Sequence, residues 1–359
     1  MTKHAGPAAL VYPCGEPPAP GQAHEIAPGV RWLRMAMPFA LNHINLWAVA
    51  DGGPAEAPAG WAILDTGLQT IDTANAWRTL LAAGGPLGGA PVTRVFVTHM
   101  HPDHIGMAGW MTRRYDCRLW MTRLEYLNCR MLVADTGREA PDDGVRFYRR
   151  AGWTDDEIET YRARFGGFGK MIHKLPDSYR RLHDGETVRI GEHEWRVVVG
   201  RGHSPEHGCL YCPDLKLFVS GDQVLPKISS NTSVFPTEPD ADPIAEWLES
   251  IEKIKREVPD DVLVLPAHNE PFRGLHARLD RLAQGQRRAL ERLRETLREP
   301  RRTIDVFGAL FARPITSEQN LLGLATGESQ ANLNHLLHRG EAVVDRVEDG
   351  VAWYRLASA

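Results

Sequence analysis

The pattern of apolar and polar positions predicts a chain built largely from short strands. From Val30 onward, apolar runs of strand length are bounded by Pro, Gly or Asp, and the first three are VRWLRM, HINLWAVA and WAILDTG. We expect these three to form an antiparallel opening. A helix over about residues 70–83 ends at a Gly-Gly-Pro stretch, and the buried strand VTRVFVTH follows it. Later strands are ETVRIG, EWRVVVG, GCLYCP, KLFVSGD and DVLVLPAH, with a helix over about residues 242–258 before the last.

Two regions lie outside this pattern in the first half of the chain. Residues 1–25 are rich in Pro, Gly and Ala, so we expect an N-terminal arm that lies over the surface or is partly disordered. Residues 123–181 are charged, aromatic and helix-leaning, and Thr154 precedes Glu157 at the spacing of a capping box. Because this stretch separates core strands, we interpret it as a helical insertion, either a mobile lid or a fixed helical pair.

After His268 the pattern changes from strands to helices. HARLDRLAQGQRRALERLRETLRE predicts a long charged helix, IDVFGALF and ESQANLNHLLHRG predict two shorter ones, and AVVDRV and VAWYRL flank a Glu-Asp-Gly turn. Three helices followed by a β-ribbon are typical of a winged helix. We therefore predict a boundary near residue 275, with a main domain over 26–275 and a winged-helix-like domain over 276–359.

Composition narrows the classes of function. The 359 residues are 43% hydrophobic and 25% charged, enough for one large core and a smaller one. The formal net charge of −4 and pI near 6.4 provide no basic field, so nucleic acid is not the expected partner. No run approaches the roughly 20 apolar residues of a membrane span, and the start has no apolar signal core, which predicts a cytoplasmic protein. We expect the five cysteines, including the Cys209-x-x-Cys212 pair, to be reduced thiols.

Residues with metal-ligating side chains follow one buried strand. VTRVFVTH continues into MHPDHIG, which gives His99-x-His101-x-Asp103-His104. Three imidazoles and a carboxylate are costly to bury together without a cation, and their donor atoms suit zinc or a neighbouring divalent ion. Further polar residues stand where other apolar runs end, namely His203, Asp222 and His268. Since strand ends can converge on one site, the sequence predicts a metal centre with these seven ligands.

The same motifs carry a family resemblance. HMHPDH, the GHS at His203, the SGD at Asp222 and the PAH at His268 resemble the ordered motifs of the metallo-β-lactamase superfamily, over about residues 30–275. The resemblance implies an α+β fold, a four-layer αβ/βα sandwich, followed here by the small winged-helix domain. It implies that one metal is bound by His99, His101 and His203, a second by Asp103, His104 and His268, with Asp222 as the bridge. WAILDTG resembles the strand and loop that carry a structural aspartate, here Asp65.

This resemblance also implies a reaction. Two divalent ions, zinc by default with manganese or iron as alternatives, would share a bridging water and supply a hydroxide nucleophile. Asp103 would orient this hydroxide and later carry a proton to the leaving atom. A winged helix after the last metal histidine resembles the subgroup of lactamase-beta-like endoribonucleases and many bacterial hydrolases. Its mixed charge favours packing, or dimerisation into a homodimer, over nucleic-acid binding.

Substrate contacts are expected from three segments. The run after Asp222 offers Lys227, Ser229 and Asn231, with Gln223 and Ser230 beside them; the loop LNHINLW offers His43 and Asn45; the insertion offers Tyr126, Tyr148 and Phe168. Lys227 suits a carboxylate or phosphate, and a solvated surface lysine is the alternative. Core packing is the alternative for the aromatic residues.

The expected substrate is a small molecule, namely a carboxylic ester, thioester or lactone. The aspartate bridge, the acidic chain and the apolar insertion favour this class. The alternative of metal-dependent phosphodiester cleavage in RNA is disfavoured by the net acidity and by the lack of a basic-aromatic strip. Hydrolysis of a β-lactam would be a side reaction. A non-enzymatic redox or sensing module with iron is a third class, and this chain carries no flavin domain or CxxC-rich module for it.

Overall fold

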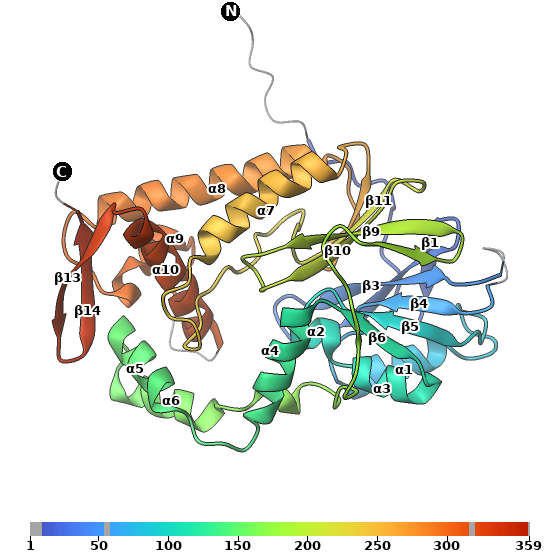
Figure 1. Ribbon diagram of the computed structural model, residues 1–359, viewed down its shortest axis with the longest axis horizontal. Helices are drawn as coiled ribbons and strands as arrows, with labels where there is room; N and C mark the ends of the chain where they lie inside the picture. Colours follow the sequence, from blue (N-terminus) through green and yellow to red (C-terminus); the bar gives the residue numbers. More distant parts are fainter. Residues whose placement is uncertain (1–8, 54–57, 316–319, 358–359) are drawn as a thin grey trace, which may run out of the picture.

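Two β-sheets packed face to face form the centre of the molecule (Figure 1). The computed structural model describes residues 9–53, 58–315 and 320–357. Within them, the larger sheet has the strand order β1 (Ala23–Ala27), β2 (Val30–Ala36), β3 (His43–Ala50), β4 (Trp61–Leu64), β5 (Val92–Phe96), β6 (Arg118–Met121) and β7 (Arg180–Arg181). The smaller sheet has the order β12 (Leu263–Pro266), β11 (Leu217–Gly221), β10 (His207–Cys212), β9 (His193–Gly200) and β8 (Thr187–Ile190).

Strand direction changes within each sheet. The predicted antiparallel opening is observed from β1 to β4, and the strands from β4 to β7 run parallel. In the smaller sheet only the pair β11 and β12 is parallel. The carboxyl ends of β5, β11 and β12 therefore open at one end of the sandwich.

Large apolar side chains hold the two sheets together. Trp32 and Trp47 stack across β2 and β3 with ring centroids 6.2 Å apart, and Trp195 from β9 joins the same buried cluster. Each of these rings is almost fully removed from water, and aromatic rings of this size dominate core energetics. The sheets consequently form a rigid base for the residues at their ends.

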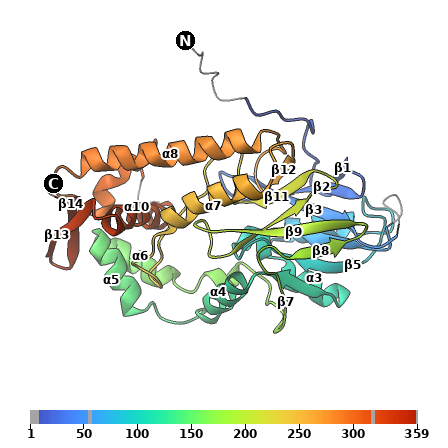
Figure 2. The ribbon, with the colours of Figure 1, turned by 45° about the horizontal axis from the view of Figure 1, so that its top comes forward.

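Helices cover both outer faces and complete four layers (Figure 2). On the larger sheet, α1 (Ile71–Leu80) and α3 (Ala108–Tyr115) pack through a core that includes Trp77 and Met111; on the smaller sheet, α7 (Pro243–Glu257) and the start of α8 (Leu275–Thr296) pack through Trp247 and Leu279. Thr70 caps α1 and Asp242 caps α7, which is the expected use of short polar side chains. The predicted α+β sandwich is confirmed.

The insertion bridges the sandwich and the C-terminal part of the chain. It contains α4 (Arg123–Ala134), α5 (Asp142–Ala151), α6 (Asp155–Arg164) and η1 (Phe168–Lys170), and the predicted capping box of Thr154 and Glu157 begins α6. Phe147 on α5 enters the C-terminal core, and the Trp153 indole donates to Thr326 Oγ1 at 2.9 Å. The insertion is therefore packed at both ends, as the alternative of a fixed helical pair describes.

The C-terminal part contains helices followed by a ribbon, in the predicted order. After α8 come η2 (Thr303–Val306), α9 (Phe307–Leu310), α10 (Asn320–His338) and the antiparallel strands β13 (Ala342–Glu348) and β14 (Val351–Leu356). The segment IDVFGALF is divided between η2 and α9 and does not form one helix. Helix α8 contributes Leu279 to the core of the sandwich and Leu293 to the C-terminal core. The predicted boundary near residue 275 thus falls at the start of a helix that both cores share.

The N-terminal arm lies against the sandwich in its described part. Val11 forms an isolated antiparallel bridge with Arg273, and β1 begins at Ala23 within the predicted arm. None of the described helices combines the length and apolar character needed to span a bilayer.

Candidate metal centre

The structure brings all seven predicted ligands together at one end of the sandwich. The side chains follow the ends of β5, β9, β11 and β12, and their donor atoms form overlapping groups in which all atoms lie within 4.8 Å of one another. Short apolar strands place the polar residues that follow them at a common edge, which is why the sequence motifs converge. We call His99, His101 and His203 the first donor group, and Asp103, His104 and His268 the second donor group.

In the first donor group, the imidazole nitrogens face one another. His99 Nε2 lies 2.8 Å from His101 Nδ1 and 3.3 Å from His203 Nε2. Ligand nitrogens about 2.0–2.1 Å from a tetrahedral zinc ion are roughly 3.3 Å apart. The first donor group therefore has the spacing of a metal-binding triad.

The Asp222 carboxylate stands between the two donor groups. Its Oδ2 lies 3.5 Å from His203 Nε2, while its Oδ1 lies 3.6 Å from His104 Nε2 and 3.3 Å from His268 Nε2. Asp103 Oδ2 closes the second donor group, 3.5 Å from His268 Nε2 and 3.7 Å from His104 Nε2. The two oxygens of Asp222 thus face different donor groups.

Two atoms of this cluster are buried without a hydrogen-bond partner. They are His104 Nε2 and Asp222 Oδ1, which lie next to each other. A buried polar atom left unpaired costs about 1–3 kcal/mol, and a coordinated cation removes that cost. The donor set of imidazole nitrogens and carboxylate oxygens therefore fits a divalent metal ion.

Three of the ligand histidines are fixed through Nδ1, the ring nitrogen that faces away from the cluster. The Nδ1 of His104 donates to Asp65 Oδ2 at 2.7 Å, that of His203 to the Asn231 carbonyl at 2.7 Å, and that of His268 to the His43 carbonyl at 2.9 Å. Such outer partners fix the tautomer and the ring orientation of a metal-binding histidine. The Nε2 atoms consequently point into the cluster.

Asp65 is held in an unusual backbone conformation to make its contact. Its φ of 58° lies in the left-handed region, which a non-glycine residue adopts at a cost. The side chain accepts hydrogen bonds from the backbone N–H and the hydroxyl of Thr98, both at 2.8 Å. These bonds tie the end of β4 to Thr98, the residue before His99. They are consistent with the structural role that the family resemblance implies for Asp65.

The two donor groups differ in electrostatics. Burial lowers the pKa of His99, His101 and His203, with added repulsion from neighbouring imidazoles, which favours the neutral form of the first donor group. Burial also opposes protonation of His104 and His268, but nearby carboxylates outweigh it and raise both pKa values. Although burial disfavours its charge, Asp222 has a pKa well below the usual range because His268 and His104 lie beside it.

His207 supports the cluster, and the sequence reasoning did not single it out. Its buried ring stacks on His99 with centroids 4.7 Å apart, and its Nε2 accepts the backbone N–H of Asp222 at 3.1 Å. Gly221 makes room for this ring, since a Cβ there would lie 2.6 Å from it. The available signal was its place as the first residue of β10, four positions after His203.

Glu125 is the second supporting residue that the sequence reasoning missed. This fully buried carboxylate on α4 accepts the backbone N–H of Met100 at 2.9 Å and that of Glu206 at 2.8 Å. Burial raises its pKa to about 7. The insertion therefore clamps the loop of His99 and His101 to the loop of His203. Nothing local distinguishes Glu125 from the many surface glutamates of the chain.

The predicted substrate contacts are scattered. Lys227 forms an ion pair with Glu270 at 2.7 Å, in keeping with the surface alternative, and Ser229 is exposed. The Tyr126 ring is buried in the core against Tyr179, and its hydroxyl donates to the Pro176 carbonyl at 2.9 Å. The ring and the polar atom of Tyr126 both have partners within the protein, in keeping with the alternative of core packing.

Two other candidates adjoin the metal centre through the backbone. The carbonyl groups of His43 and Asn231 accept from histidine ligands, as described above. The His43 ring accepts the Asn269 N–H at 2.9 Å, and burial lowers its pKa to about 4. The Asn231 amide donates to Glu328 at 2.7 Å. Both side chains are engaged within the protein and support the ligands.

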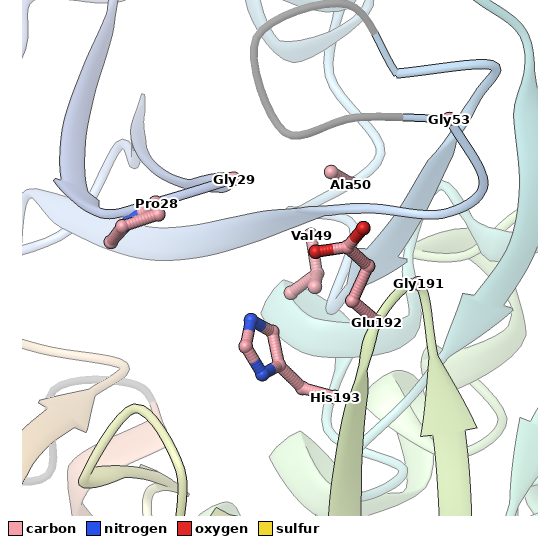
Figure 3. A pocket seen from close by; sticks show the side chains of 8 residues that line it. All are labelled: Pro28, Gly29, Val49, Ala50, Gly53, Gly191, Glu192 and His193. Atoms are coloured by element: carbon pink, nitrogen blue, oxygen red, sulfur yellow. The ribbon is translucent and has the colours of Figure 1, made fainter.

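Two hollows are found in the surface. Figure 3 shows one at the far ends of β3 and β9, where Ala50 and His193 line about 20 Å³, room for about one water molecule. A groove of about 570 Å³ lies between α7 and residues 181–184 and carries charges of both signs. Neither is lined by any of the seven ligands, so the donor atoms rather than a cavity locate the site.

Comparison with known families gives matches over most of the chain. Residues 55–295 match the family described as "Metallo-beta-lactamase superfamily", and residues 290–357 match "Metallo-beta-lactamase-like, C-terminal domain". The crystal structure of a beta-lactamase domain protein from Burkholderia ambifaria is similar over 97% of this chain and 98% of its own, with a TM-score of 0.85 and 38% identity.

Curated relatives are more distant. A probable metallo-hydrolase, YqjP, from Bacillus subtilis is 24% identical over 332 residues, which cover 90% of this chain and 96% of the relative. A hydroxyacylglutathione hydrolase from Cereibacter sphaeroides is 35% identical over 63 residues, or 18% of this chain and 25% of the relative. The similarity to the second relative is confined to a short segment.

Replacing Glu125 tests its role as a clamp. Glu125→Ala leaves two buried backbone N–H groups unpaired, so we expect the free energy of unfolding of the metal-free protein to fall by about 2–4 kcal/mol. Urea denaturation measures this change. Glu159→Ala, which removes an exposed glutamate on α6, is the matched control and should leave the midpoint almost unchanged. Equal midpoints for the two variants would contradict the clamp.

Proton competition at the second donor group predicts pH-dependent metal binding. Raised pKa values favour the protonated forms of His104 and His268 in the metal-free protein, and a metal ion must displace these protons. Zinc affinity should therefore fall as the pH is lowered through the raised pKa values, by up to about tenfold per pH unit for each displaced proton. Chelator competition measures the slope. Asp65→Asn removes a charge that raises the pKa of His104, so its slope should be shallower; an affinity independent of pH would refute the prediction.

Proposed function

The chain belongs to the metallo-beta-lactamase superfamily, as its motifs predicted, and it is a metal-dependent hydrolase; we propose that it binds two divalent metal ions and cleaves a carboxylic ester, thioester or lactone. The observation that carries this proposal is the Asp222 carboxylate, whose two oxygens face different donor groups. A carboxylate in that position suits a bridge between two ions. Zinc is the expected metal because imidazole nitrogens dominate the donor set.

The first donor group would hold one ion and the second donor group the other. Ions bound there would lower the pKa of a water molecule and polarise a carbonyl oxygen of the substrate. Asp103 is the most exposed carboxylate of the cluster and engages the neighbouring histidines through Oδ2. Its Oδ1 is therefore the atom we assign to accept the proton of the attacking water and to return it to the leaving atom.

Exposed apolar side chains near the metal centre support an organic acyl group as substrate. On α10, Leu321 and Leu324 lie seven and four residues before Glu328, on the helix face that bonds Asn231 beside His203. On α4, Leu124, Leu127 and Met131 are exposed at helical spacing. Both helices lie at the end of the sandwich that carries the donor groups (Figure 1). Apolar walls of this kind suit an acyl chain better than a phosphodiester backbone.

Metal analysis and a substrate panel test the proposal together. The panel contains lactones, thioesters, p-nitrophenyl esters, a β-lactam, bis-p-nitrophenyl phosphate and short RNA. We expect about two metal ions per chain and turnover of an acyl substrate. Asp103→Ala should lower kcat by about 10²–10⁴-fold through loss of proton transfer.

Asp143→Ala, which changes an exposed carboxylate on α5, is the matched control and should retain full activity. Cleavage of RNA or of the phosphodiester alone would transfer the function to the nuclease alternative. Turnover of the β-lactam alone would favour a β-lactam hydrolase. Wild-type protein that binds no divalent metal would refute the proposal altogether.

The apolar face of α10 predicts a dependence on acyl length. Leu324→Glu places a charge where an acyl chain would lie, so kcat/KM for an octanoyl ester should fall by roughly tenfold or more, the worth of one buried leucine contact. The value for an acetyl ester should stay within about twofold. Val347→Glu changes another exposed apolar residue, on β13, and should affect neither ester. Equal losses for both esters with Leu324→Glu would count against an acyl site on α10.

A further inference from the structure

A short segment joins the metal centre to the C-terminal helix α10. We call residues 230–234 the strap. At one end, the Ser230 hydroxyl donates to the backbone carbonyl of Asp222, and the Asn231 carbonyl accepts His203 Nδ1. At the other end, the Val234 N–H donates to the Gly327 carbonyl of α10 at 3.0 Å. The strap therefore contacts a ligand of the first donor group and the C-terminal part of the chain within five residues.

Helix α10 approaches the strap more closely than a side chain would allow. A Cβ at Gly327 would lie 2.8 Å from the Val234 carbonyl oxygen and 2.9 Å from the Ser233 side chain. This glycine lies within a helix, so glycine is needed here because the backbones approach closely, and not because of an unusual backbone angle. The backbone contact places the neighbouring residue, Glu328, beside Asn231.

The Asn231 side chain is held from two directions. Its amide nitrogen donates to Glu328 Oε2 at 2.7 Å, and its amide oxygen accepts the Ser233 hydroxyl at 2.6 Å. Burial raises the pKa of Glu328 to about 7, so this carboxyl group occupies an environment that stability alone disfavours. A polar group retained at such a cost is a candidate for a positioning role.

We propose that Glu328 is a positioning residue for the metal centre, which acts through Asn231 to orient His203 and thereby makes α10 part of the metal-binding apparatus. The proposal rests on the proposed function in that His203 binds a metal ion. Fixing the Asn231 side chain fixes its peptide group, and the carbonyl of that group lies 2.7 Å from His203 Nδ1. Loss of an outer partner of a metal-binding histidine lowers metal affinity by about 10–100-fold.

Metal affinity, rather than activity, provides the decisive readout. Zinc affinity is measured by chelator competition, and the visible absorption spectrum of the cobalt-substituted protein reports the geometry of the ligands. Glu328→Ala should weaken zinc binding at the first donor group by about tenfold, at the low end for loss of an outer partner because Asn231 retains its backbone carbonyl. Glu328→Gln keeps an oxygen that accepts from Asn231, so its affinity and spectrum should stay close to those of the wild type.

A control on the same helix separates positioning from general loosening. Gln330 lies two residues on and bonds Thr303 and Asn334 within the C-terminal part. Gln330→Ala should lower the melting temperature of the metal-free protein and leave its zinc affinity unchanged. If Glu328→Ala weakened zinc binding no more than Gln330→Ala does, the proposal would be overturned.

A second route avoids any effect of Glu328 on the folding of α10. Asn231→Ala removes the side chain that Glu328 holds and keeps the carbonyl that His203 needs. We expect this variant to lose zinc affinity by the same factor as Glu328→Ala, and the double variant to lose no more than either single one. Additive losses would show that the two residues act separately and would overturn the proposal. Failure of the proposed function differs from both outcomes, because wild-type protein would then bind no metal.

Discussion

Charge balance in the buried cluster is the constraint on which the rest of the structure depends. Five histidines and two aspartates direct their donor atoms into one small volume, where water is largely excluded. The neutral first donor group and the proton-holding second donor group are two responses to that exclusion. A cation satisfies both, since it uses the lone pairs of one group and replaces the protons of the other. Such a site requires firmly positioned donors, because a misplaced imidazole at this depth leaves a polar atom unpaired.

The sandwich provides that positioning through its apolar centre. Tryptophan rings and branched aliphatic side chains fix the relation of the two sheets. The ligands stand in the segments that follow the strands, from one residue beyond the end of β11 to eight residues beyond the end of β5. The bonds of Asp65 to Thr98 and of Asn45 to the Pro266 carbonyl then tie β4 to the His99 loop and β3 to the end of β12. Core packing and the precision of the metal centre are thus parts of the same arrangement.

The ligands could be predicted from sequence because each is marked by two local features, an apolar strand and the His or Asp that follows it. A strand of apolar residues followed by His or Asp identifies a side chain at a sheet edge without knowledge of its neighbours, and four segments of the chain repeat this pattern. The partner of Lys227 is Glu270, and the partner of Asn231 is Glu328. Both partners are distant along the chain, so only the folded structure could show that these side chains were already engaged. The roles of Glu125 and His207 could not be predicted from the sequence for the same reason, because each side chain bonds backbone groups of another loop.

The groups that accept hydrogen bonds from the ligand histidines come from two parts of the chain. His104 and His268 are fixed by Asp65 and by the His43 carbonyl, both within the sandwich. His203 is fixed by the strap, whose position depends on α10. Helix α10 is braced in turn by the insertion, through the bond of Trp153 to Thr326, and the insertion clamps the first donor group directly through Glu125. The second donor group therefore needs only the sandwich, whereas the first also depends on the two additions to it. A substrate that contacted α4 or α10 would touch an element that also positions the first donor group, so substrate binding and ligand geometry would be coupled.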